Sequence, residues 1–277
     1  MSDCLRPSPR VAVFALLLAL LAGCNRGGTP PAAAPVPGPT ATPAAPAAPV
    51  VLKDVIETTP GYIIGISYPS QAAAYPPLAQ ALHAYAEAAR AELMQAVDGL
   101  KGAKPRAPYD LSLQFSMVVE TPRVVAVAAD GSTYTGGAHG APLVERFVWL
   151  PQLQQMLAAE QLIPAADGWT PVSAYVREQL MTELSASMDE EALEGDVRAS
   201  QMSLRSRMID DGTAPSAANF ARFEPVMNAD GSIRALRFVF PPYQVAPYVE
   251  GTVTVAVPAR VLLPLVAADY RPLFRQG

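Results

Sequence analysis

The chain has 277 residues, of which 51% are hydrophobic and 16% charged, and its formal net charge is −5. This composition is that of a globular protein, and the acidic balance argues against nucleic acid or an anionic membrane surface as a partner. Both cysteines, Cys4 and Cys24, lie near the start, so the rest of the chain has no disulfide and no thiol chemistry.

A short apolar run, Val11 to Ala22, follows two arginines and precedes Gly23 and Cys24. This order is typical of a secretory signal. The run is too short for a transmembrane helix, which needs about 20 apolar residues. Ordinary secretion with cleavage elsewhere is the other alternative. The sequence Leu-Ala-Gly-Cys resembles the lipobox of bacterial lipoproteins. The resemblance implies a signal peptide over residues 1–23 and acylation of Cys24, which would anchor the chain in a lipid bilayer.

Residues 24–50 are rich in proline and alanine, and we expect them to form a tether. Such a segment cannot bury enough apolar surface to fold. At about 3.1 Å per residue it would reach on the order of 70 Å when extended. Asn25 follows the cysteine, whereas Asp at that position retains enteric lipoproteins in the inner membrane. This resemblance implies the periplasmic face of the outer membrane.

The pattern of residues 51–277 predicts helices and strands in mixed order. In the first half, alternation or valine-rich runs predict strands over Tyr62 to Tyr68, Leu111 to Met117, Arg123 to Ala129 and Leu143 to Leu150, the last three consecutive and antiparallel. A stripe of apolar residues predicts a helix from Pro76 to about Val97.

In the second half, the sequence predicts a short helix from Pro151 to Ile163 and a longer one that begins at Thr170-Pro171. Residues 189–211 are charged and predict a helix with a break near Gly195. Asp230-Gly231 predicts a hairpin between two strands, followed by a strand and a closing helix from Pro258 to Ala267. Strands in runs with helices between them indicate an α+β fold, with antiparallel sheets and packed helices.

His139 is the more informative of the two histidines. It lies in Tyr134-Thr-Gly136-Gly137-Ala-His139-Gly, where glycines allow positive φ and a close approach of the backbone to another group. It is either part of a binding loop or hydrogen-bonded locally to hold a turn. The other, His83, is expected to be a partly exposed helix residue.

A second segment, residues 240–251, places Tyr243 and Tyr248 among prolines. Tyrosine gives a large contact area at low entropic cost, so the segment could contact a protein or glycan. A stiff crossover with packed rings is the equal alternative. Beyond these two segments the sequence has no nucleophile elbow, zinc motif or phosphate loop, and we expect neither catalytic residues, metal nor cofactor.

The two segments occur in the order found in one bacterial envelope family, and the match covers roughly residues 52–270. The chain resembles an RsiV-type extracytoplasmic domain preceded by a PdaC-like domain. The resemblance implies two adjoining α/β parts, over residues 51–150 and 151–277. It further implies that the domain binds lysozyme, as RsiV-type domains do.

Three functions therefore remain open. The first is a non-catalytic envelope lipoprotein that binds a protein or peptidoglycan, with lysozyme or a related wall hydrolase as the specific expectation. The second is a peptidoglycan-acting hydrolase that uses His139, and the third is a structural envelope component. The candidate ligand-binding residues are Tyr134, Gly136, Gly137, His139, Tyr243 and Tyr248.

Overall fold

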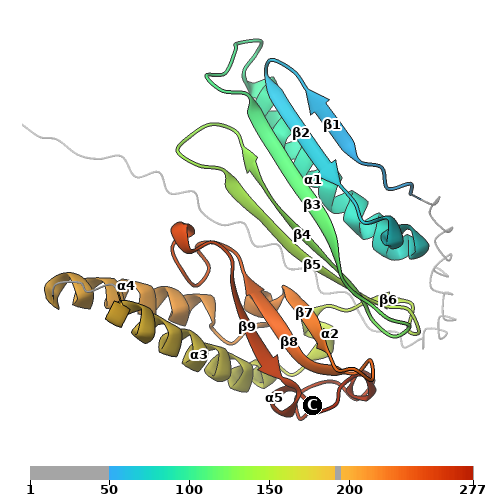
Figure 1. Cartoon of the computed structure of the whole chain (residues 1–277), viewed down its shortest axis with the longest axis vertical. Helices are drawn as coiled ribbons and strands as arrows, with labels where there is room; N and C mark the ends of the chain where they lie inside the picture. The colour runs from blue at the N-terminus through green and yellow to red at the C-terminus, as the bar shows by residue number, and fades with distance from the viewer. Residues whose placement is uncertain (1–49, 191–194, 277) are drawn as a thin grey trace, which may run out of the picture. The chain divides into compact units, whose positions relative to one another are not determined.

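Two β-sheets and five α-helices organise the residues described in this computed structural model, 50–190 and 195–276 (Figure 1). All but one of the strand pairings are antiparallel, so the expected α+β class is confirmed. The predicted signal peptide, Cys24 and nearly all of the tether lie outside the described residues. Within the described ranges, no helix combines the length and apolar character needed to cross a membrane.

The first sheet has six strands in chain order: β1 (Val55–Thr58), β2 (Tyr62–Ser67), β3 (Tyr109–Glu120), β4 (Val125–Tyr134), β5 (Ala141–Leu150) and β6 (Gln155–Met156). The predicted antiparallel trio is confirmed as β3, β4 and β5. β2 and β3 are parallel, and the helix α1 (Pro76–Gly99) forms the crossover that a parallel pair requires. The sheet continues to β6, past the expected boundary at residue 150.

Helix α1 covers one face of this sheet and forms a first core with it (Figure 1). Leu78, Leu82 and Leu93 of the predicted apolar stripe are fully buried. Tyr68 stacks on Phe115 with ring centroids 4.8 Å apart, and Tyr85 meets the edge of the same ring at 6.3 Å. The helix therefore forms because its apolar positions recur at the helical period.

Two tyrosines in this core make stability sensitive to alkaline pH. Burial, reinforced by nearby carboxylates, raises the pKa of both Tyr68 and Tyr85 to about 12. Above pH 10 the unfolded chain loses these protons while the folded chain retains them, so the free energy of unfolding should fall between pH 10 and 12. Denaturant titrations across this range test the prediction. The variant Tyr85→Phe should show a smaller fall, and an identical fall would contradict the assignment.

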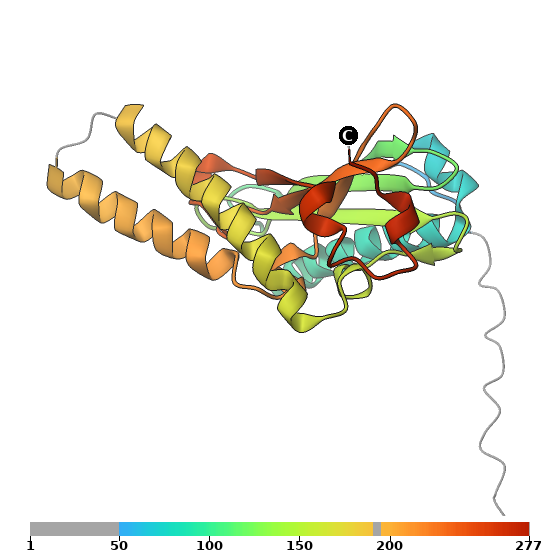
Figure 2. The same ribbon diagram turned by 90° about the horizontal axis from the view of Figure 1, so that it is seen from below.

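The second sheet has three antiparallel strands: β7 (Phe223–Met227), β8 (Ile233–Phe240) and β9 (Val253–Pro258). The predicted hairpin is confirmed, because Asn228 N donates to Ser232 O at 2.7 Å and Gly231 has φ of 78°. Helix α3 (Trp169–Glu190) packs on this sheet, and α4 (Gly195–Gly212) lies beside α3 (Figures 1 and 2). The predicted helix start at Thr170-Pro171 lies in the first turn of α3.

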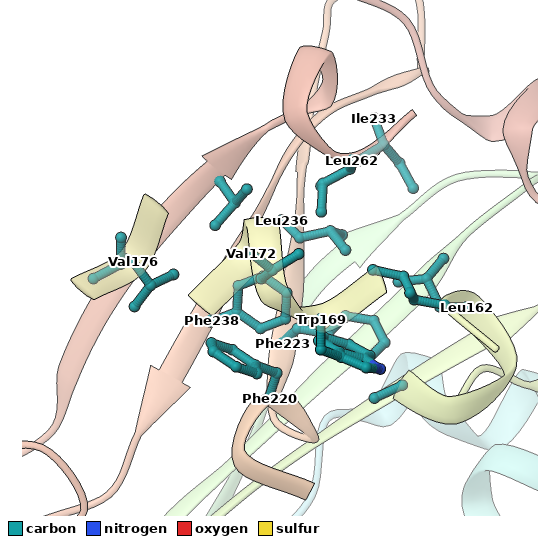
Figure 3. Packing of buried hydrophobic residues seen from close by; sticks show 14 of the residues in the cluster. Leu162, Trp169, Val172, Val176, Phe220, Phe223, Ile233, Leu236, Phe238 and Leu262 are labelled. Atoms are coloured by element: carbon teal, nitrogen blue, oxygen red, sulfur yellow. The ribbon is translucent and has the colours of Figure 1, made fainter. Parts of the chain in front are cut away.

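The second core lies between α3 and this sheet (Figure 3). Trp169 stacks on Phe220 at 5.4 Å, and Phe238 meets the edge of Phe220 at 5.2 Å. Val172 and Val176 of the predicted stripe are fully buried here. Val148 and Leu150 of β5 belong to the same core, so the two sheets share buried surface.

Two predicted helices were wrong in length. The segment from Pro151 to Ile163 is helical only over α2 (Ala159–Leu162), because Gln155 and Met156 pair with the end of β5 instead. The closing helix is helical only over α5 (Ala259–Leu262), and Ala267 N donates to the carbonyl of Leu162, the last residue of α2, and not to a residue of its own segment. The first segment is shortened by its pairing with β5, whereas the closing segment keeps one further helical hydrogen bond, from Val266 N to Leu262 O at 3.0 Å, before the chain turns away.

A buried ion network joins the two sheets. Arg146 of β5 has a side chain that is 7% exposed, and it pairs with Glu224 of β7 at 2.6 Å and with Asp130 at 3.0 Å. Arg237 of β8 reaches Glu224 at 3.3 Å. Arg222 donates to Val144 O at 2.7 Å and adds a further link. Because water does little to solvate the buried charges of Arg146 and Glu224, these two side chains require partners of opposite charge.

Candidate functional site

Three ring side chains from two distant segments meet on the surface, and we call them the aromatic cluster: His139, Tyr243 and Tyr248. His139 and Tyr248 are stacked with centroids 4.3 Å apart, and Tyr243 and Tyr248 lie 5.6 Å apart. The Tyr243 hydroxyl lies 3.1 Å from His139 Nε2, across 104 residues of sequence. The β4–β5 loop and the loop between β8 and β9 thus lie side by side (Figures 1 and 2).

The β4–β5 loop presents His139 at an exposed tip. Gly136 and Gly137 have φ of 102° and 101°, a conformation that favours glycine. The Tyr134 hydroxyl donates to Gly137 O at 3.2 Å and closes the loop from within. Tyr134, Gly136 and Gly137 therefore shape the loop and do not join the aromatic cluster.

The hydrogen bonds of His139 assign its tautomer. Its Nδ1 lies 3.1 Å from Gly140 O, which can only accept, so Nδ1 carries the proton in the neutral ring. Nε2 then accepts from the Tyr243 hydroxyl. Both nitrogens of the neutral imidazole are engaged, one with a backbone carbonyl and one with a phenol.

Tyr243 holds its place at a cost in backbone energy. Its φ is 72°, in the left-handed region, where a bulky residue is a genuine outlier. Such conformations cost of order 1–3 kcal/mol and gather at functional sites. The residue is nevertheless 53% exposed, so little burial offsets this cost.

Contacts with α4 and with Asn219 hold the loop that carries the two tyrosines in place. The Gln244 amide donates to Gly212 O at 3.0 Å and to Asn219 O at 2.9 Å. Gly212 allows the close approach, since a Cβ there would lie 2.0 Å from Gln244 O. Arg205 of α4 pairs with Glu250 at 2.5 Å and holds the turn that begins at Tyr248.

An open groove of about 640 Å³ adjoins the cluster, between α4 and the turn after Pro247. Val249 is 89% exposed on one side of it, and Val197 of α4 is half exposed on the other. Exposed aliphatic side chains beside exposed rings are typical of surfaces that contact other molecules. The surface offers ring faces, aliphatic walls and one ion pair.

The structure brings together three of the six ligand-binding residues predicted from the sequence. The lipidation residue, Cys24, lies outside the described residues. His83 is half-buried on α1, in agreement with a partly exposed helix residue. The sequence did not indicate Gln244, Arg205 and Glu250, which position the cluster, because no local pattern marks their long-range partners.

Among the described residues no group of three or more His, Cys, Asp or Glu could hold a metal ion.

Two family models match successive parts of the chain. The model described as Deacetylase PdaC matches residues 56–141, and the model described as Protein of unknown function (DUF3298) matches residues 163–260. The chain is therefore similar to a PdaC-type domain over the first range and to a DUF3298 domain over the second. His139 lies in the first match, whereas Tyr243 and Tyr248 lie in the second, so the aromatic cluster combines residues from both matched segments.

One solved structure shares the fold of this chain, and a second is similar to it. A DUF3298 family protein from Pseudomonas aeruginosa PAO1 is 14% identical, with a TM-score of 0.51, over 81% of this chain and 94% of that one. A DUF3298 family member from Bacteroides fragilis NCTC 9343 is also 14% identical, with a TM-score of 0.48, over 79% of this chain and 93% of that one. No curated protein matches the chain at the sequence level.

Proposed function

We propose that the protein is a membrane-anchored envelope lipoprotein whose folded part binds a protein or cell-wall ligand without catalysis, through the aromatic cluster. One observation carries the proposal: three rings from loops 104 residues apart converge on an exposed surface, with Tyr243 in a strained backbone conformation. The backbone strain of Tyr243 is not offset by burial of its side chain, which is expected of a residue that serves to bind a ligand.

The specific ligand that we propose is lysozyme or a related wall hydrolase. The resemblance to RsiV-type domains motivates this choice. The exposed aliphatic side chains Val197 and Val249 also favour a protein ligand, since protein interfaces bury apolar and aromatic side chains at their centre.

The arrangement of His139 favours binding over hydrolysis. A general base needs a free nitrogen within reach of the substrate proton, and here Nε2 accepts from Tyr243 while Nδ1 faces a backbone carbonyl. The hydrolase alternative predicts that wild-type protein releases products from muropeptides and that His139→Ala abolishes this turnover. The anchor at Cys24, the tether and the outer-membrane location complete the proposal and rest on the sequence.

Calorimetric titration of residues 51–277 with lysozyme and, separately, with muropeptides tests the proposal. We expect saturable binding to lysozyme that is weakened by His139→Ala. Binding to muropeptides alone would redirect the proposal to a cell-wall ligand. Absence of heat with both ligands would remove its specific form.

A further inference from the structure

A second candidate site lies away from the aromatic cluster, near the end of the chain. Arg234 and Arg260 line a polar cavity of about 380 Å³ together with Tyr175 and Gln276. Both arginines are exposed. The volume falls within the range of small-ligand pockets, about 300–1,000 Å³.

The sheet register brings the two arginines together. Ala235 of β8 pairs with Pro258 of β9, so Arg234 and Arg260 flank neighbouring positions of adjacent chain segments. Phe274 forms a parallel bridge with Ile233, and Arg275 N donates to Ile233 O at 3.0 Å. These contacts place Gln276 beside the strand that holds Arg234. Helix α5, which holds Arg260, also lies near the end of the chain (Figure 1).

The pairing of the other arginines sets these two apart. Within residues 50–190 and 195–276, all but four arginine side chains have an ion pair or hydrogen bond. The four are Arg106, Arg207, Arg234 and Arg260, and two of them line this one cavity. Asp230, four residues before Arg234 in the sequence, pairs with Arg275 at 3.7 Å. Neighbouring like charges are destabilising unless an opposite charge joins them.

We propose that this cavity binds a phosphate-type oxyanion between Arg234 and Arg260. Guanidinium groups match phosphate oxygens in geometry, and two of them match a dianion in charge. Gln276 and Tyr175, two further residues with polar groups, also line the cavity. The net charge of the whole chain is −5, so the chain as a whole does not attract anions. Attraction of an anion to this cavity must come from the two arginines. The inference is independent of the function proposed above.

The test is an NMR titration of residues 48–277, the compact unit that contains every described element. Inorganic phosphate is added at constant ionic strength, with chloride as the control anion. We expect saturable shifts at Arg234, Arg260 and Gln276 with phosphate alone. Arg234→Gln and Arg260→Gln should each weaken binding at least tenfold, whereas Arg207→Gln, a matched loss of one unpaired arginine, should not.

A second arm distinguishes free phosphate from a lipid headgroup. Flotation with phosphatidylglycerol vesicles, compared with phosphatidylcholine vesicles, reports headgroup binding. Retention on phosphatidylglycerol that Arg260→Gln abolishes and Arg207→Gln preserves would identify a lipid phosphate as a source. The inference is overturned if phosphate and phosphatidylglycerol both fail to bind, or if Arg207→Gln weakens binding as much as the cavity variants.

Discussion

Replacing Tyr243 by glycine should weaken lysozyme binding at least tenfold while the free energy of unfolding stays within about 1 kcal/mol of wild type. Loss of a central aromatic contact typically costs binding about 2 kcal/mol or more. The folded glycine variant lacks the contacts of this half-exposed ring, which lowers its stability. It also lacks the backbone strain of Tyr243 at φ of 72°, roughly 1–3 kcal/mol, which raises its stability. Calorimetric titration and urea denaturation measure the two effects.

Tyr243→Ala is the matched control, because it removes the same ring without relieving the backbone. It should lose binding equally but be less stable than the glycine variant by about 1 kcal/mol. Ile56→Ser, an exposed apolar change on β1, should leave binding unchanged. Equal stability of the glycine and alanine variants would contradict the strain, and undiminished binding by both would contradict the role of the ring.

Replacing Glu224 by alanine should lower the free energy of unfolding by about 1.5–3 kcal/mol, because Arg146 loses its most buried partner and keeps only the exposed Asp130 and backbone carbonyls. Arg146 and Glu224 have side chains that are 7% and 10% exposed, so water does little to solvate the remaining guanidinium. Urea denaturation followed by circular dichroism gives the value.

Asp130→Ala serves as the control for this pair. Asp130 contacts the same arginine at 3.0 Å, but its side chain is 52% exposed, so its loss should cost only about 0–1 kcal/mol. Similar losses for the two variants would show that burial does not set the strength of this network.

The regular elements were predictable from the sequence because their apolar residues follow one period over several turns. The stripes of α1 and α3 are of this kind, whereas the hairpin turn was predictable from the Asp230-Gly231 dipeptide alone. Short elements escaped prediction. β1 and β6 have four and two residues, too few for a pattern, and hydrogen bonds to partners distant in sequence define them.

The sequence indicated the two segments that form the candidate site, but it did not indicate that they contact each other. Local composition drew attention to His139 and to the segment with Tyr243 and Tyr248, but their contact depends on how both sheets pack. Gln244, Arg205 and Glu250 gave no signal, because an isolated polar residue in a loop or helix has the same pattern whether or not it anchors a site. Arg146 and Glu224, 78 residues apart, were missed for the same reason.

Mapping a bound ligand onto the surface of the protein decides whether the aromatic cluster is the binding site. In an NMR titration of residues 48–277 with lysozyme, the amides of residues 135–140 and 243–250 should shift or broaden first, together with those around Val197 on α4. Perturbation confined to another surface, such as the cavity beside Pro60 and Lys104, would show that the aromatic cluster is not the binding site.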